Sequence, residues 1–330
     1  MPRATPQTPA AKIRRDAVFW KGCTRFPRLT EREKTTAAAI HIDHGRAKAA
    51  MRAAVDALCT GEPRSFRNPG RLGEAGDFIF SEFERLGCRV ARQPFDAAGR
   101  SWFNVIAEPP ADPAKPLVII GAHYDVCGNT PGADDNASSI AAMLSLAENW
   151  EPHAGRAGVR LQFAAYSLEE PPFFNTPLMG SRVHAQSLPP GDPPAFMLSL
   201  DCLGYYNDGK RSQKYPVGLA RVSYPSVGNF LFAITNPRGK KNAKAFYSLA
   251  RGHSNLRVEY IALPSAAVNF SDHYSYWRHN IPAFVLTDTA WFRNPHYHQL
   301  GDTPGTLDYA RLAETVQLLA RYLATRQPAR

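Results

Sequence analysis

The stretch Leu-Val-Ile-Ile-Gly-Ala-His-Tyr-Asp, residues 117–125, decides the fold. Its first four residues are continuously apolar, a pattern typical of a strand that is buried on both faces of a sheet. His123 and Asp125 come at the end of this strand. The stretch therefore predicts a central strand that carries polar side chains at its carboxyl end.

Strand and helix patterns alternate on both sides of this central strand. We predict helices over residues 73–86, 136–150, 179–187, 242–252 and 307–324, and further strands over residues 88–94, 102–108, 159–166, 196–201 and 282–287. Gly87 can end the first helix, and Asn136 can cap the second. Such alternation indicates an α/β protein, a three-layer α/β/α sandwich with a mixed, largely parallel central sheet.

The composition indicates a globular protein without a membrane span. The chain has 330 residues, 44% of them hydrophobic, and contains no run of eighteen apolar residues. There are 39 basic and 29 acidic side chains, but nine of the basic and three of the acidic ones lie in residues 1–40. Because the remainder is nearly balanced, we predict neither a nucleic-acid nor a membrane partner. Residues 1–40 are predicted to be a basic leader, disordered or loosely packed, and residues 41–330 a single catalytic domain.

The five cysteines are odd in number and lack CxxC spacing, which favours a reducing compartment. No apolar region of signal-peptide length follows Arg14 and Arg15, so we expect a cytoplasmic protein. A single Cys59–Cys88 bridge in an exported form stays open. The oligomeric state is not indicated by the sequence.

Acidic and histidine side chains follow three of the predicted strands. His123 and Asp125 come after one, Glu169 and Glu170 after another, and Asp201 after a third. Ligands bind beyond the carboxyl ends of strands in α/β sheets, so these side chains are expected to meet. Two adjacent glutamates in a partly buried place would repel each other unless cations offset their charge, and a metal offers that compensation.

Two further segments carry candidate ligands. Residues 131–136 hold Asp134 and Asp135 before a predicted helix, where helix capping is an equally good explanation. Residues 294–303 hold two histidines in a loop, and loop histidines are commonly exposed. Asp302 can orient one of these histidines or cap the segment after the loop.

Taken together, the segments resemble the co-catalytic zinc aminopeptidase family, whose relatives include glutamate carboxypeptidase and glutaminyl cyclase. The resemblance covers roughly residues 73–319 and rests on GAHYD, PGADDNAS, SLEE followed by MGSR, LSLD-x-x-G, SDH-x-x-x-W-x-x-x-x-IPA and NPHYH-x-x-x-DT, in that order. Several such motifs in one order carry far more weight than any of them alone. The fold implied is that of the zinc exopeptidases.

The resemblance implies a site with two zinc ions. His123 and Asp201 would bind one ion, Glu170 and His298 the other, and Asp134 would bridge both. Glu169 would be the general base, Tyr297 a hydrogen-bond donor to the oxyanion, and Asp125 a partner for the second nitrogen of His123. The resemblance also implies a cis peptide bond between Asp134 and Asp135.

The family pattern is less informative about substrate. Residues 171–178 are longer than in simple aminopeptidases, and Phe173, Phe174 and Cys202 are the predicted wall of the substrate pocket. Ser139 and Gln299 depart from the usual glycine and threonine of the family, but neither departure removes a ligand.

The expected activity is removal of single residues from peptides with a free amino terminus. One alternative is a glutaminyl-cyclase-like transferase with one zinc ion, although Tyr297 favours hydrolysis because the cyclases carry tryptophan there. The other is a non-catalytic binding module on the same scaffold, against which the complete set of ligands and the base count.

Overall fold

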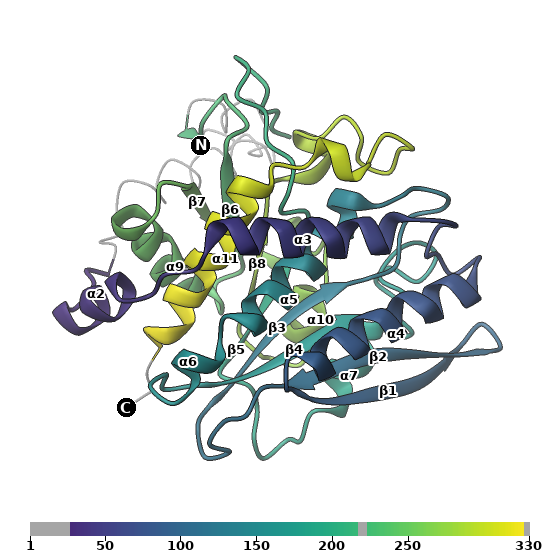
Figure 1. Ribbon diagram of the computed structural model, residues 1–330, viewed down its shortest axis with the longest axis horizontal. Coiled ribbons are helices and arrows are strands. Elements are labelled where there is room, and N and C mark those ends of the chain that lie inside the picture. Colours follow the sequence, from purple (N-terminus) through teal and green to yellow (C-terminus); the bar gives the residue numbers. More distant parts are fainter. Residues whose placement is uncertain (1–26, 217–222, 327–330) are drawn as a thin grey trace, which may run out of the picture.

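The structure is a computed structural model that describes residues 27–216 and 223–326. In this part of the chain an eight-stranded sheet runs in the order β1-β2-β4-β3-β5-β8-β6-β7 (Figure 1). Its strands are β1 (Arg89–Ala97), β2 (Arg100–Glu108), β3 (Leu117–His123), β4 (Arg160–Tyr166), β5 (Phe196–Leu200), β6 (Phe230–Thr235), β7 (Arg257–Ala262) and β8 (Ala283–Thr287). The pairs β4–β3, β3–β5, β5–β8 and β6–β7 are parallel, whereas β1–β2, β2–β4 and β6–β8 are antiparallel. The predicted mixed, largely parallel sheet is confirmed.

Strand β3 is buried along its whole length, as its apolar run predicts. Alternate side chains point to opposite faces of a strand. Val118 and Ile120 accordingly join one hydrophobic cluster, and Leu117 and Ile119 join a second one on the other face. The central strand is therefore covered on both sides.

Helices form the two outer layers. The larger cluster contains side chains of α3 (His44–Cys59), α4 (Pro69–Arg85), α5 (Ser139–Glu148), α9 (Lys240–His253) and α11 (Tyr309–Ala324). The smaller cluster contains side chains of α7 (Gly180–Ser187) and α10 (His273–Trp277). Figure 1 shows α3, α5 and α11 in front of the sheet and α10 behind it. The three-layer α/β/α arrangement is thus present.

The remaining helical segments are short. They are α2 (Glu31–Ala38), α6 (Glu151–Ala154), a π-type turn η1 (Ala133–Ser138), and the 3-10 turns η2 (Ser265–Ala267), η3 (Ala290–Phe292) and η4 (Pro304–Thr306). Turn η1 joins the loop after β3 to helix α5, so the two adjacent aspartates lie in it rather than in a regular helix.

The prediction for the amino-terminal segment does not hold for residues 31–40. Helix α2 begins with a capping box, in which Thr30 and Glu33 satisfy each other's backbone N–H groups. Ala37 and Ile40 are buried in the larger cluster, and Ile40 also accepts a hydrogen bond from Arg321 of α11. These residues therefore belong to the folded body, while residues 1–26 lie outside the described part of the chain.

The helices and cysteines of the described residues bear on membrane crossing and on disulfide formation. None of the helices in these ranges is both long and apolar enough to cross a bilayer. Cys59 and Cys88 are free thiols, so the bridge that the sequence left open is not formed. Cys23 lies outside the described residues.

Candidate metal centre

The candidate site lies at the carboxyl ends of the four strands β4, β3, β5 and β8. His123 is the last residue of β3, and Asp201 directly follows β5. Glu169 and Glu170 lie in the loop that leaves β4, and His298 comes from the loop before η4. The sheet thus brings together residues that are far apart in the sequence, as expected for an α/β protein.

Asp135 stands at the centre of this group. Its Oδ1 lies 3.3 Å from Nε2 of His123, and its Oδ2 lies 3.0 Å from Nε2 of His298. Asp135 is buried, yet the two histidines lower the pKa of its carboxyl group despite that burial. One carboxylate therefore offers a separate oxygen to each of two histidines, which is the arrangement of a bridging ligand.

The sequence assigned this position to Asp134, and the structure does not support that assignment. Oδ1 of Asp134 accepts a 2.8 Å hydrogen bond from the backbone N–H of Gly204, and Oδ2 accepts one of 2.8 Å from the amide of Asn294. Both oxygens of Asp134 are thus engaged away from the two histidines. Asp135 replaces Asp134 as the proposed metal ligand.

The local backbone explains the exchange. Asp135 has φ −107° and ψ 87°, well outside the helical region, and the cis bond follows it, between Asp135 and Asn136. The predicted cis bond between Asp134 and Asp135 is therefore wrong by one residue. Asn136 does not cap α5 either, because its amide bonds the backbone of Leu200 and Cys202 at the end of β5.

Asp125 holds the loop that carries both glutamates. Its carboxylate oxygens accept hydrogen bonds of 3.0 Å from the backbone N–H groups of Glu169 and Glu170. The same carboxylate lies 3.6 Å from Nδ1 of His123, whereas the backbone oxygen of Asp125 is nearer to that nitrogen, at 3.3 Å. Asp125 thus lies beside His123, and its carboxylate makes its shorter contacts to the backbone of the two glutamates.

The two glutamates are buried and electrostatically distinct. Burial raises the pKa of Glu169 well above its ordinary value, although the nearby charge of His123 opposes this effect. Burial and the charge of Asp135 raise the pKa of Glu170 to about 7. Oε1 of Glu170 lies 3.2 Å from Nε2 of His298, while Oε2 of Glu169 is 3.9 Å from Nε2 of His123. Glu170 therefore contacts His298 directly, and Glu169 stands beside the group.

Asp201 and Cys202 complete the opposite end of the site. One oxygen of Asp201, one of Asp135 and the sulfur of Cys202 all lie within 4.8 Å of one another. The Cys202 thiol donates a 3.3 Å hydrogen bond to Oδ1 of Asp201. Burial raises the pKa of Asp201, and the charge of His123 opposes the rise.

Tyr297 stacks on the ring of His298, with centroids 3.8 Å apart and planes inclined by 17°. Burial and the charge of Asp135 raise the pKa of its phenol far above the ordinary value, so the hydroxyl keeps its proton and remains a hydrogen-bond donor. Burial opposes charge on His298, but the carboxylates of Asp135 and Glu170 outweigh it and raise the pKa of that ring to about 10.

Three atoms of the site converge without bonding to each other. Oδ2 of Asp135, Oε1 of Glu170 and Nε2 of His298 are buried, and none makes a hydrogen bond with a described residue. Nε2 of His298 nevertheless lies only 3.0 Å from Oδ2 of Asp135 and 3.2 Å from Oε1 of Glu170. Buried polar atoms without partners are uncommon. Imidazole and carboxylate donors around a common point fit a zinc ion.

Two residues outside the ligand set fix the loop that carries Asp135. The carboxylate of Asp302 accepts the backbone N–H groups of Asp134 and Asp135 at 2.8 and 3.1 Å. The buried guanidinium of Arg64 donates to the backbone oxygens of Pro131 and Gly132, each at 2.6 Å. The sequence marked Asp302 as a possible orienting group but gave no signal for Arg64, because these two backbone oxygens are 67 and 68 residues further along the chain.

The predicted pocket residues are divided between the site and the core. Cys202 is fully buried beside Asp201. Phe173 is buried in the larger hydrophobic cluster, where its ring packs edge-on against Phe66 at 5.5 Å. Phe174 is half-buried in the same loop. An exposed aromatic residue that the sequence did not single out, Trp291, lies 5.4 Å from the ring of Tyr297.

Comparison with known proteins identifies a family and several relatives. Residues 104–323 match the model of Peptidase family M28. The uncharacterized protein YfbL of Escherichia coli K12 is 38% identical over 268 residues, covering 78% of this chain and 81% of that protein. A probable leucine aminopeptidase of Arthroderma otae is 26% identical over 234 residues, covering 67% of this chain and 56% of that protein.

Solved structures share the fold at lower identity. The LapA aminopeptidase of Legionella pneumophila superimposes with a TM-score of 0.70 at 17% identity, covering 93% of this chain and 79% of that one. A Zn-dependent exopeptidase from Parabacteroides distasonis gives 0.63 at 19% identity, covering 84% and 98%. A glutaminyl cyclase from Bacteroides thetaiotaomicron gives 0.62 at 16% identity, covering 86% and 98%. Because the last of these is named for a different reaction, the shared fold does not select the activity.

Proposed function

This chain belongs to peptidase family M28, and on that premise we propose that it is a zinc-dependent aminopeptidase with two metal ions in its active site. The observation that carries the proposal is the position of Asp135, whose two carboxylate oxygens face two different histidines, His123 and His298. A site for one ion does not require a carboxylate divided in this way.

The remaining ligands are proposed from their distances to Asp135. His123 and Asp201 would hold one ion with Oδ1 of Asp135, and Glu170 and His298 would hold the other with Oδ2. Bound zinc would lower the pKa of a water molecule and polarise the scissile carbonyl. Each proposed position has imidazole and carboxylate donors, the set that zinc accepts while keeping a place for water.

Glu169 is the proposed general base. It makes no short contact with His298, so its carboxyl group stays free to take a proton from the attacking water and return it to the leaving amine. Burial raises the pKa of Glu169, which makes its carboxylate a stronger proton acceptor. Tyr297 retains its proton and can donate a hydrogen bond to the oxygen of the carbonyl under attack.

The preference for a free amino terminus follows from the charge of the site. With zinc bound, the carboxylates of Asp135, Glu169, Glu170 and Asp201 would lie around the metal ions in one buried pocket. A free α-amine can meet a carboxylate and a metal ion in this pocket, while an acetylated one loses that pairing and adds bulk. Leaving a buried charge without its partner costs about 3–5 kcal/mol, enough to suppress turnover by roughly two to four orders of magnitude.

Zinc-loaded protein and three peptides test the proposal. The first peptide has a free amino terminus, and the second is the same peptide with an acetylated terminus. The third begins with glutamine and is otherwise identical to the first. The products are identified by mass spectrometry. Release of one residue from peptides with a free amino terminus, and none from the acetylated peptide, supports the aminopeptidase. Loss of ammonia from the glutamine peptide without cleavage supports a cyclase, and internal cleavage of the acetylated peptide excludes an exopeptidase.

Elemental analysis of the same sample tests the number of ions. Close to two zinc ions per chain are expected after saturation and gel filtration. A single tightly held ion would refute the bridging role of Asp135 and favour the one-zinc cyclase.

A further inference from the structure

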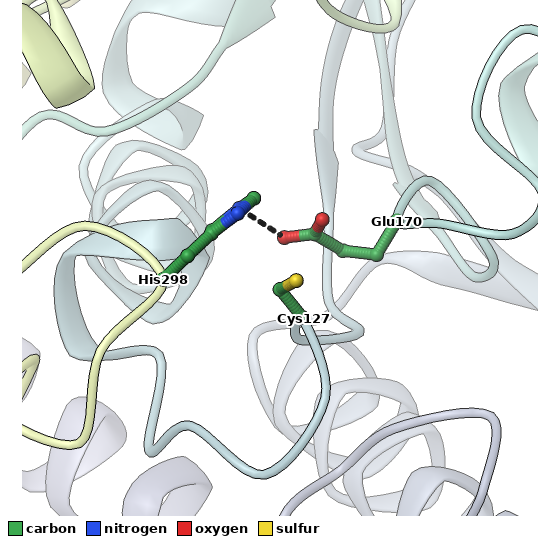
Figure 2. Close-up of side chains that lie close together, drawn as sticks. All are labelled: Cys127, Glu170 and His298. Atoms are coloured by element: carbon green, nitrogen blue, oxygen red, sulfur yellow. Dashed lines mark ion pairs between the residues drawn. The ribbon is translucent and has the colours of Figure 1, made fainter.

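A cysteine lies against one end of the site in a position that the family pattern does not assign. The sulfur of Cys127, one oxygen of Glu170 and one ring nitrogen of His298 all lie within 4.8 Å of one another. Figure 2 shows the Cys127 sulfur beside the ion pair of Glu170 and His298. The three side chains come from three different loops, after β3, after β4 and before η4.

Glu170 and His298 point toward each other beside this sulfur. Oε1 of Glu170 and Nε2 of His298 make no hydrogen bond with any residue in the described ranges, although they lie 3.2 Å apart. The side chain of Glu170 is only 5% exposed, so bulk water does not satisfy it fully. The two groups thus mark the place of a ligand independently of the cysteine beside them.

Sulfur fits this place by size and by chemistry. A tetrahedral zinc ion with a sulfur at about 2.3 Å and a nitrogen at about 2.0–2.1 Å holds these two donors about 3.6 Å apart. The separation found here, at most 4.8 Å, permits that geometry with a small movement of a partly buried side chain. Soft thiolate donors also favour zinc and cadmium over harder ions.

We propose that Cys127 is a sulfur ligand of the metal ion held by Glu170 and His298. This inference rests on the two-metal centre of the proposed function. A sulfur ligand at one metal position would make the two positions chemically different. The position of His123 and Asp201 keeps only oxygen and nitrogen donors and so retains the place for water, whereas the position of Glu170 and His298 gains a thiolate as its fourth protein donor. Cadmium is therefore expected to enter the Cys127 position first.

Cys202 is the natural competitor for this role and supplies the matched control. Its sulfur lies near Asp135 and Asp201, at the other metal position, and its thiol already donates a hydrogen bond to Asp201. Cys127→Ser and Cys202→Ser each replace one sulfur by oxygen at nearly unchanged size. The two variants therefore separate the two ends of the site.

Cobalt(II) added to the metal-stripped full-length protein is the probe. We expect visible ligand-field bands that report binding, together with a near-ultraviolet sulfur-to-cobalt charge-transfer band that saturates with one equivalent. Cys127→Ser should lose the charge-transfer band and keep the ligand-field bands, and Cys202→Ser should keep both. Cadmium NMR of the wild-type protein should show one resonance shifted downfield by sulfur and one without that shift.

The outcomes distinguish this inference from the proposed function. Ligand-field bands without charge transfer in the wild-type protein would refute the role of Cys127 and leave the metal centre intact. Persistence of the charge-transfer band in Cys127→Ser, or its loss in Cys202→Ser, would also overturn the assignment. Absence of any cobalt binding would refute the metal centre itself.

Discussion

Exchange of the neighbouring aspartates for asparagine, one at a time, tests the centre of the site. Asp134→Asn and Asp135→Asn are the same chemical change at adjacent positions, and they remove the same charge. We expect Asp134→Asn to lower stability and Asp135→Asn to weaken metal binding. The reason is that Asp135 faces His123 and His298 whereas Asp134 faces Gly204 and Asn294.

The cost of Asp134→Asn can be derived from its contacts. An asparagine keeps one oxygen for the N–H of Gly204, but its amide group would face the amide of Asn294 and lose that hydrogen bond. Asn294 cannot simply rotate, because its own oxygen accepts the backbone N–H of His296 at 2.9 Å. A hydrogen bond to a charged group contributes about 1.5–3 kcal/mol. Part of this is offset, because removing the charge of Asp134 relieves its repulsion with the buried Asp288. We expect a loss of stability within that range and retention of both ions.

Asp135→Asn should act on metal binding instead. Removing one member of a buried charged group costs about 3–5 kcal/mol, or roughly two to four orders of magnitude in the metal-binding constant. Competition with a chelating dye measures that constant, zinc analysis after gel filtration measures occupancy, and thermal unfolding of the metal-free proteins measures stability. If Asp134→Asn lost both ions while Asp135→Asn retained them, the assignment from the structure would be refuted.

Three further predictions concern the base, the protons and the amino-terminal segment. Glu169→Gln should keep both ions and lower kcat by at least about a hundredfold, the scale of general-base catalysis, and near-normal turnover with full zinc content would contradict this. Zinc uptake by metal-free protein near pH 7 should release protons, and the affinity for zinc should fall as the pH decreases. The pKa of Glu170 is raised to about 7 and that of His298 to about 10, and both groups must lose protons to bind metal. A pH indicator in weak buffer measures the release, and uptake of zinc without proton release would contradict this prediction. Ile40→Ala should lower the free energy of unfolding by about 2–5 kcal/mol, because Ile40 is buried in the larger cluster. Glu31→Ala, on the exposed side of α2, is the control. Equal stability of the two variants would contradict the packing of Ile40.

The fold was predictable wherever the sequence carries a local periodicity. The apolar run of β3 predicted a fully buried strand, and the alternation along the chain predicted the layered sheet. Strands β6 and β7 and helix α3 were not predicted. For β6 the reason is that a short apolar run does not by itself distinguish a strand from a helix. Helix α2 was missed for another reason: its exposed face is charged and few of its residues are buried, so its packing on α11 gives little pattern.

The choice between Asp134 and Asp135 shows why the site could be predicted only in part. Both are acidic residues before the same helix, and both are buried, so neither composition nor periodicity separates them. Their directions are set by Gly204, Asn294 and Asp302, which lie 70, 160 and 168 residues further along the chain than Asp134. These partners take up the oxygens and the backbone N–H of Asp134, and they leave the carboxylate of Asp135 to the histidines. Ligand type was readable from the sequence because chemistry selects it, whereas ligand identity depended on contacts that only the folded chain brings together.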